Sequence, residues 1–156
     1  MSAAVVVAAR AFLGTPYRHQ ASTIGAGCDC LGLLRGVWRA VLGDEPMELP
    51  AYRADMRDPV NAGALRIAAE RFLIAEHGPL AAGQVLLFRL GGLVEPKHCG
   101  ILVGESRFIH AQERLGVVEA SLTEAWGRRV SGRFRFPTTE SAPTTVSPRP
   151  LSRGPS

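Results

Sequence analysis

Hydrophobic residues recur with a helical period in three segments of the first half of the chain. The first segment is followed by Gly14 and Pro16, a pair typical of a helix end. The third begins at Asp58 and Pro59, an N-cap residue followed by proline at the first helical position. The expected helices are residues 3–13, 31–42 and 58–78. The stretches between them, residues 17–27 and 44–58, are expected to be loops.

The second half of the chain carries short apolar runs in place of the helical period. Each run is bounded by glycine or by charged residues, and their spacing is that of antiparallel hairpins. The runs are residues 84–90, 99–103, 107–110, 117–120 and 130–136. Helices followed by such a sheet predict an α+β fold, in which the N-terminal helices pack on a small antiparallel sheet.

Residues 137–156 follow neither pattern. This segment consists almost entirely of Pro, Thr, Ser, Arg and Gly, with few large apolar groups. Such a composition cannot bury enough apolar surface to offset the conformational entropy lost on ordering. We therefore expect a single domain over residues 1–136 and a disordered tail over residues 137–156.

Charge and hydropathy exclude several classes of partner. The formal net charge is +4, and the cations are scattered, with no run longer than Arg128–Arg129. Without a basic stripe interleaved with aromatic residues, nucleic acid is not an expected partner. No uncharged apolar stretch approaches about 20 residues, so no membrane span is expected. The apolar N-terminus has no cationic residue before it and is interpreted as a helix, not a signal peptide, which favours synthesis in the cytoplasm.

Cys30 is the first candidate for chemistry because it opens the second expected helix. A cysteine in the first turn meets unpaired backbone N–H groups and the positive end of the helix dipole. Both favour the thiolate, which is the nucleophilic form. The alternative interpretation is a small buried core residue, as most free cysteines are. Asp29, directly before it, is expected to cap the helix.

Two histidines on neighbouring expected strands are the candidate partners of Cys30. His98 and Cys99 are adjacent on a strand, so their side chains point to opposite faces. Cys99 continues at period 2 into apolar residues and is expected to enter the core, which leaves His98 as the candidate general base. His110 lies on the next strand and is expected to orient the His98 ring. His19 and His77 are expected to be surface residues.

A zinc site built from Cys28, Cys30, His98 and Cys99 is the competing interpretation. The C-x-C spacing differs from the usual two-residue gap, and the strand argument sends His98 and Cys99 in opposite directions. We therefore expect no metal and no other cofactor.

At these positions the sequence resembles the NlpC-type cell-wall peptidases, which are bacterial papain-like cysteine endopeptidases. The resemblance spans about residues 9–136. More narrowly, the sequence is similar to the branch of the family encoded in phage-like tail modules, including gene transfer agents. Four separate motifs, in the family's order, carry it. They are the segments 13–17 (LGTPY), 28–33 (CDCLGL), 82–88 (AGQVLLF), and 98–101 (HCGI) with 108–111 (FIHA).

The resemblance implies a papain-like core and assigns roles to four residues. Cys30 is the implied nucleophile, His98 the general base and His110 the orienting residue. Tyr17 matches a tyrosine that lines the site and helps the oxyanion region beside the Cys30 backbone N–H. The implied reaction is hydrolysis of a peptide bond in peptidoglycan stem peptides, typically next to D-glutamate, through a thioacyl-enzyme.

The sequence also departs from the family pattern. Leu31 stands where the family usually has serine, which is expected to alter the polarity of the site. No wall-binding module or secretion signal is recognisable, which favours delivery by a phage-like particle, alongside its tail proteins, or access after lysis. The alternatives are an amidase or acyltransferase on the same fold and a non-catalytic component of a tail-like particle.

Overall fold

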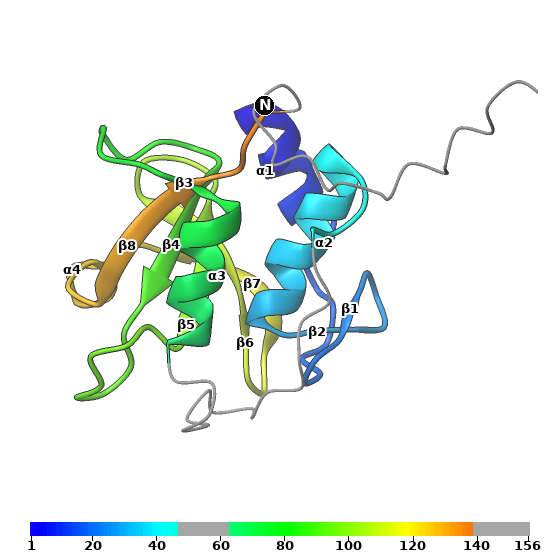
Figure 1. The fold of residues 1–156 in the computed structure, drawn as a ribbon. Coiled ribbons are helices and arrows are strands. Elements are labelled where there is room, and N and C mark those ends of the chain that lie inside the picture. Colours follow the sequence, from blue (N-terminus) through cyan, green and yellow to red (C-terminus); the bar gives the residue numbers. More distant parts are fainter. Residues whose placement is uncertain (47–62, 139–156) are drawn as a thin grey trace, which may run out of the picture.

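The helices of the first half lie against one face of a six-stranded antiparallel sheet formed by the second half (Figure 1). This arrangement is seen in a computed structural model that describes residues 1–46 and 63–138. The helices are α1 (Ser2–Arg10), α2 (Cys30–Leu42), α3 (Ala64–Phe72) and the short α4 (Glu124–Gly127). The α+β prediction is confirmed.

The large sheet has the strand order β3-β8-β4-β5-β6-β7, and every neighbouring pair is antiparallel. Its strands are β3 (Ile74–Ala75), β4 (Gln84–Phe88), β5 (His98–Leu102), β6 (Arg107–Gln112), β7 (Gly116–Ser121) and β8 (Val130–Arg135). Each of the five expected strands is present within two residues of its predicted ends. The hairpin of β5 and β6 places 98–102 directly beside 107–112, which is the part of the sheet that matters for the site.

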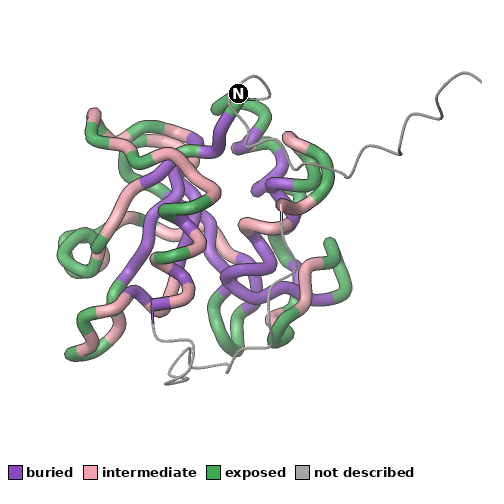
Figure 2. Tube along the Cα trace, viewed as in Figure 1, coloured by how far each residue is buried: buried purple, intermediate pink, exposed green. Residues whose placement is uncertain are grey.

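Most residues of the central strands are buried (purple in Figure 2), and apolar side chains pack on both faces of the sheet. Because side chains alternate along a strand, Val85 and Leu87 pack against the helices, whereas Leu86 and Phe88 enter a second, smaller cluster on the opposite face. Strand β4 is therefore buried on both sides, which explains why its sequence is continuously apolar. The helix-facing cluster also contains Cys30 and connects the start of α2 to the sheet.

The expected loop over residues 17–27 is wrong in part, because it contains a small two-stranded sheet. Strand β1 (Ser22–Thr23) pairs with β2 (Gly27–Cys28) across a tight turn at Gly25, which has φ +77°. Tyr17 forms an isolated bridge with Cys28. Strands of two residues leave no periodic signal, and their pairing depends on the turn and on α2 beneath them.

Two of the expected helices end earlier than predicted. Helix α1 stops at Arg10, and tighter i to i−3 hydrogen bonds continue the chain to Gly14, which adopts φ +84° and donates to the Val117 carbonyl. Helix α3 ends at Phe72 because Leu73 is extended and β3 then pairs with β8, so residues 73–78 are not helical. That pairing joins segments distant in sequence, which a local pattern does not reveal.

Some expectations fall outside the described residues. These are the Asp58–Pro59 helix start and residues 139–156 of the expected tail. The domain boundary at residue 136 stays a prediction. Among the described helices, none is long and apolar enough to cross a membrane.

Candidate functional site

Helix α2 begins at Cys30 because the preceding residue caps it. Asp29 is extended, and its carboxylate accepts a hydrogen bond from the Gly32 N–H at 2.7 Å. The other carboxylate oxygen accepts from the Gln20 N–H, also at 2.7 Å. Asp29 is buried, so these charge-assisted bonds fix the loop before α2 and the first turn of the helix as one unit.

Gly32 explains how closely that loop approaches the helix. A Cβ atom at Gly32 would lie 1.9 Å from the carbonyl oxygen of Ala21, a contact that no side chain can make. The same carbonyl accepts a hydrogen bond from the Asp29 N–H at 3.2 Å. The position of Cys30 therefore depends on a glycine two residues after it and on the backbone of the loop.

The two predicted histidines meet on the sheet face opposite the helices. His98 begins β5 and His110 lies in β6, and their atoms Nε2 and Nδ1 are 2.8 Å apart. Gly100 leaves the space for this arrangement, because a Cβ there would lie 2.9 Å from Phe108 and 3.3 Å from His110. The bond leaves Nδ1 of His98 as the ring nitrogen available to a further partner.

That partner is Cys30. The pKa of the Cys30 thiol is lowered to about 5 by a hydrogen bond from the Cys99 thiol and by the hydrogen bond and charge of His98, which together outweigh the raising effect of burial. Cys30 is only 7% exposed, and the first-turn N–H groups of α2 favour the thiolate in the same direction. Cys30 and His98 thus form the thiolate–imidazole pair that nucleophilic catalysis requires.

His110 is held neutral. Burial, together with the neighbouring His98, lowers its pKa to about 4. Nδ1 of a neutral His110 can accept a hydrogen bond from the Nε2–H of His98. This bond fixes the tautomer and the ring orientation of His98. The two rings are close enough for this, and the orienting role of His110 stays a prediction.

Tyr17 forms one wall of the same site and is half-buried. Burial, followed by the negative charge of Cys30 and Asp29, raises the pKa of its phenol well above the usual range. The hydroxyl therefore keeps its proton near a thiolate and can donate a hydrogen bond to a developing oxyanion.

These side chains open onto one cleft with a volume of about 320 Å³. The cleft brings together all four residues selected from the sequence. It is lined by Tyr17, Cys30, Leu90, Leu93, Lys97, His98, His110, Ala111, Gln112, Glu113 and Trp126. From the described residues the cleft receives a candidate nucleophile, a candidate base, an orienting group and hydrogen-bond donors, an arrangement that suits acyl transfer to and from Cys30.

Two residues at the site were missed by sequence reasoning. Cys99 is fully buried, and its sulfur lies 3.2 Å from the carbonyl oxygen of Cys30, so its single proton can be donated either to that carbonyl or to the Cys30 sulfur. Strand alternation predicted that Cys99 enters the core, but it did not indicate that the start of α2 lies there. Trp126 comes from α4, whose four residues are too few to produce a hydrophobic period.

The zinc alternative is not supported by the side-chain arrangement. The Cys28 thiol donates to the Asp29 carbonyl and the Cys99 thiol to the Cys30 carbonyl, each at 3.2 Å. Among the described residues, no group of three or more His, Cys, Asp or Glu side chains is placed to hold a metal ion. His19 and His77 are exposed, as expected.

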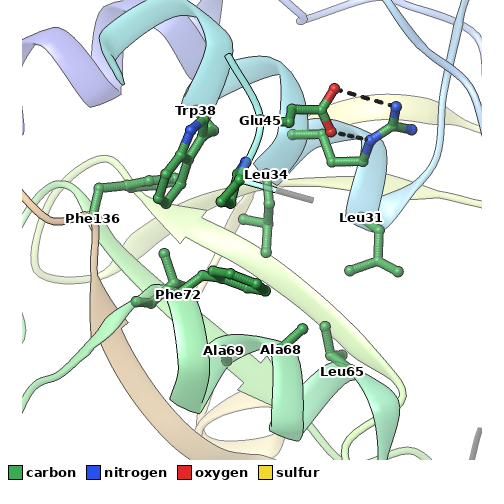
Figure 3. A pocket seen from close by; sticks show the side chains of 12 residues that line it. Leu31, Leu34, Trp38, Glu45, Leu65, Ala68, Ala69, Phe72 and Phe136 are labelled. Atoms are coloured by element: carbon green, nitrogen blue, oxygen red, sulfur yellow. Dashed lines mark hydrogen bonds and ion pairs between the residues drawn. The ribbon is translucent and has the colours of Figure 1, made fainter. Parts of the chain in front are cut away.

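A second, smaller cavity of about 80 Å³ lies between α2 and α3, and its wall is almost entirely apolar (Figure 3). Leu31, Leu34 and Trp38 of α2 face α3 across it. Leu31 contributes to this cavity and is not among the described residues that line the Cys30 cleft. The expectation that Leu31 alters the polarity of the site is therefore wrong, because the first turn of α2 directs its side chain away from the cleft.

The family of the chain emerges from comparison with known proteins. A family model described as the NlpC/P60 family matches residues 14–135. The chain is similar to an Escherichia coli protein named murein DD-endopeptidase MepS/murein LD-carboxypeptidase, with 28% identity over 116 residues, which are 74% of this chain and 52% of the relative. The chain thus spans about half the length of that curated relative.

Solved structures share the fold. An NlpC/P60 family protein from Bacillus cereus superposes with a TM-score of 0.62 and 18% identity, over 87% of this chain and 40% of the other. The NlpC/p60 domain of the peptidoglycan hydrolase SagA gives a TM-score of 0.57 and 24% identity, over 87% of this chain and 99% of that domain.

Proposed function

Because this chain belongs to the NlpC/P60 family, we propose that it is a cysteine endopeptidase that hydrolyses peptide bonds in peptidoglycan stem peptides. One observation carries the proposal: Cys30 at the start of α2 shares a cleft with His98, and His98 is bonded to His110 at 2.8 Å. The names of the similar E. coli protein and of SagA, both of which refer to murein or peptidoglycan, support this substrate class.

The proposed reaction proceeds in two steps. The Cys30 thiolate attacks the scissile carbonyl carbon, and the C–N bond breaks as the His98 imidazolium gives its proton to the leaving amine. His98 then takes a proton from water, whose oxygen attacks the thioester. The C–S bond breaks, and the carboxylic product leaves with Cys30 returned to the thiolate. The Tyr17 hydroxyl and the Cys30 N–H are the proposed donors to the oxyanion.

The test is a digest of purified muropeptides followed by mass spectrometry. Its substrates include cross-linked dimers and tetrapeptide monomers, since the E. coli relative is named for both a DD-endopeptidase and an LD-carboxypeptidase activity. We expect Cys30→Ala to lose at least about 10³-fold in rate. Cys28→Ala, which removes a buried thiol outside the cleft, is the matched control and keeps most activity. Unchanged cleavage by Cys30→Ala would contradict the proposal.

The same digest separates the alternatives. An acyltransferase or amidase on this fold resolves the acyl-enzyme with a different nucleophile or releases a different amine, and product masses reveal either. A non-catalytic tail component gives no product, and its Cys30 is alkylated at pH 6 no faster than a free thiol.

We further propose that the protein reaches the wall with a phage-like particle or after lysis. The support is the resemblance of its motifs to peptidases of phage-like tail modules. Isolation of such particles from the producing cells, followed by detection of this chain with tail proteins, tests the particle route. Its absence from purified particles contradicts the particle route.

A further inference from the structure

Trp126 lies where the two histidines of the site meet the aromatic cluster on the outer face of the sheet. Its ring centroid is 5.9 Å from that of His98 and 5.3 Å from that of His110. The ring centroids of Phe88 and Phe108 lie 5.0 Å and 5.4 Å from that of Trp126. Trp126 is half-buried and lines the Cys30 cleft, so one side of the indole covers the histidines and another faces the cleft.

The backbone holds α4 in place on both sides of Trp126. Thr123 caps the helix by accepting from the Trp126 N–H at 3.3 Å. Before it, the Leu122 N–H donates to Ser106 in the turn between β5 and β6 at 2.7 Å. After it, the Arg129 carbonyl accepts from Arg89 at the end of β4 at 2.7 Å. The indole is therefore fixed relative to the strands that carry the histidines.

The ring orientations differ in a way that suits two functions. The indole is nearly perpendicular to His110, at 79°, which is the favourable edge-to-face arrangement for a neutral ring. It is closer to parallel with His98, at 35°, and within the distance at which an aromatic face attracts a cation. The face thus favours the imidazolium of His98 that pairs with the Cys30 thiolate.

We propose that Trp126 is a positioning residue for catalysis, which excludes water from the His98–His110 hydrogen bond and holds the His98 ring toward Cys30. The inference rests on the proposed function of the cleft. Without the indole, water reaches the Nε2–Nδ1 bond, and the His98 ring gains freedom to rotate away from the sulfur.

Other charged groups around the indole enter any pH dependence. The Arg129 guanidinium lies 5.2 Å from the Trp126 ring. Lys97 and Glu113 line the cleft, and Arg128 pairs with Glu124 on α4 at 2.6 Å. The experiment therefore needs a readout that reports on the contact between the indole and the histidine pair.

Fluorescence supplies this readout because the chain has only two tryptophans. Trp38→Phe changes a residue of the α2–α3 cavity and leaves Trp126 as the sole emitter. We expect the emission of Trp38→Phe at pH 7 to be quenched by the neighbouring His98 ring, which is the cation of the proposed pair. Emission should rise in Trp38→Phe/His98→Gln. Equal emission from the two variants shows that the indole does not sense His98 and overturns the proposal.

The second measurement is the rate of Cys30 alkylation as a function of pH. We expect Trp126→Ala to slow alkylation at pH 6 by about tenfold. The Cys30–His98 pair then lacks the indole face that attracts the His98 cation. Trp126→Phe, which keeps an aromatic face, is expected to recover part of the rate, and Trp38→Phe to retain the parental profile. In hydrolysis, kcat should fall more than KM rises. A parental alkylation profile in folded Trp126→Ala overturns the proposal.

These readouts separate two kinds of failure. If no variant hydrolyses muropeptides, the proposed function fails, whereas the fluorescence and alkylation measurements still decide the role of Trp126. If the parent hydrolyses them and Trp126→Ala is unchanged in both alkylation and hydrolysis, only the inference about Trp126 fails.

Discussion

The end of β2 and the start of α2 carry two buried cysteines, separated only by Asp29, that differ in chemistry. Cys28 is fully buried, and burial, followed by the charges of Asp29 and Cys30, raises the pKa of its thiol to about 12. Cys30 is almost as buried, yet its pKa is lowered to about 5 by Cys99 and His98. At pH 7 the first is a thiol and the second a thiolate.

The difference lies in which groups face each sulfur. The Cys28 thiol donates to the Asp29 carbonyl, a local contact that favours the protonated form. Cys30 opens a helix and receives a thiol and an imidazole from β5, far along the chain. Burial alone therefore produces an inert cysteine, whereas burial combined with donors from a second element produces a nucleophile.

Removal of the His98 imidazole should reduce the difference in reactivity between Cys28 and Cys30 more than any other change. His98→Gln deprives Cys30 of its hydrogen-bonded cation and its proton donor, so hydrolysis should fall by about 10²- to 10⁴-fold. Alkylation of Cys30 should shift to higher pH at the same time. His77→Gln, at an exposed position, is the control. Rapid alkylation of Cys30 at pH 5 in His98→Gln would show that the imidazole is not what keeps the sulfur ionised.

A change at Cys99 tests the second donor. In the parent, thiolate reactivity should appear as pH rises through about 5, because the lowered pKa of Cys30 leaves the thiol form only below that value. Cys99→Ala removes a hydrogen-bond donor and should move this midpoint upward, which slows alkylation at pH 5 by about tenfold. Cys99→Ser keeps a hydrogen-bond donor, so its alkylation midpoint should lie between those of the parent and Cys99→Ala.

Cys28→Ser is the matched control for Cys99, since it replaces a buried thiol with the same type of backbone hydrogen bond. Its alkylation profile should follow the parent. An equal shift in Cys28→Ser and Cys99→Ala would mean that general loosening of the core, and not the donor, sets the reactivity of Cys30.

The smallest expected effect is at Asp29, between the two cysteines. Its negative charge raises the pKa of both thiols, so Asp29→Asn should lower both midpoints by less than about one pH unit. The amide can accept only one of the two bonds now received from Gln20 and Gly32, which should cost about 1–2 kcal/mol of unfolding free energy. Alkylation profiles and urea unfolding measure the two effects. Shifts of opposite sign for the two cysteines contradict this account.

The parts of the site that the sequence predicted depend on local geometry. The helix start at Cys30 follows from its capping residue, and the opposite directions of His98 and Cys99 follow from strand alternation. The contact of His98 with His110 required only a hairpin between adjacent strands. Each of these relations joins residues within one element or between sequential elements.

The parts that were not predicted depend on contacts between distant segments. Strand β3 exists because it pairs with β8, and the Cys99 contact exists because β5 packs against α2. Trp126 reaches the histidines because hydrogen bonds at both ends place α4 over the sheet. None of these arrangements is encoded in a periodic pattern, because two or four residues carry too few positions to show one.

The contact between Gly32 and the Ala21 carbonyl has a consequence for protein engineering. Because the loop before α2 touches the helix that carries the nucleophile, changes in the loop's length or backbone shift Cys30 itself. A library intended to alter which peptides are accepted is therefore better placed at Leu90 and Leu93, which line the cleft and lie outside this loop and α2. Substitutions there change the lining of the cleft and leave the position of the attacking sulfur unchanged.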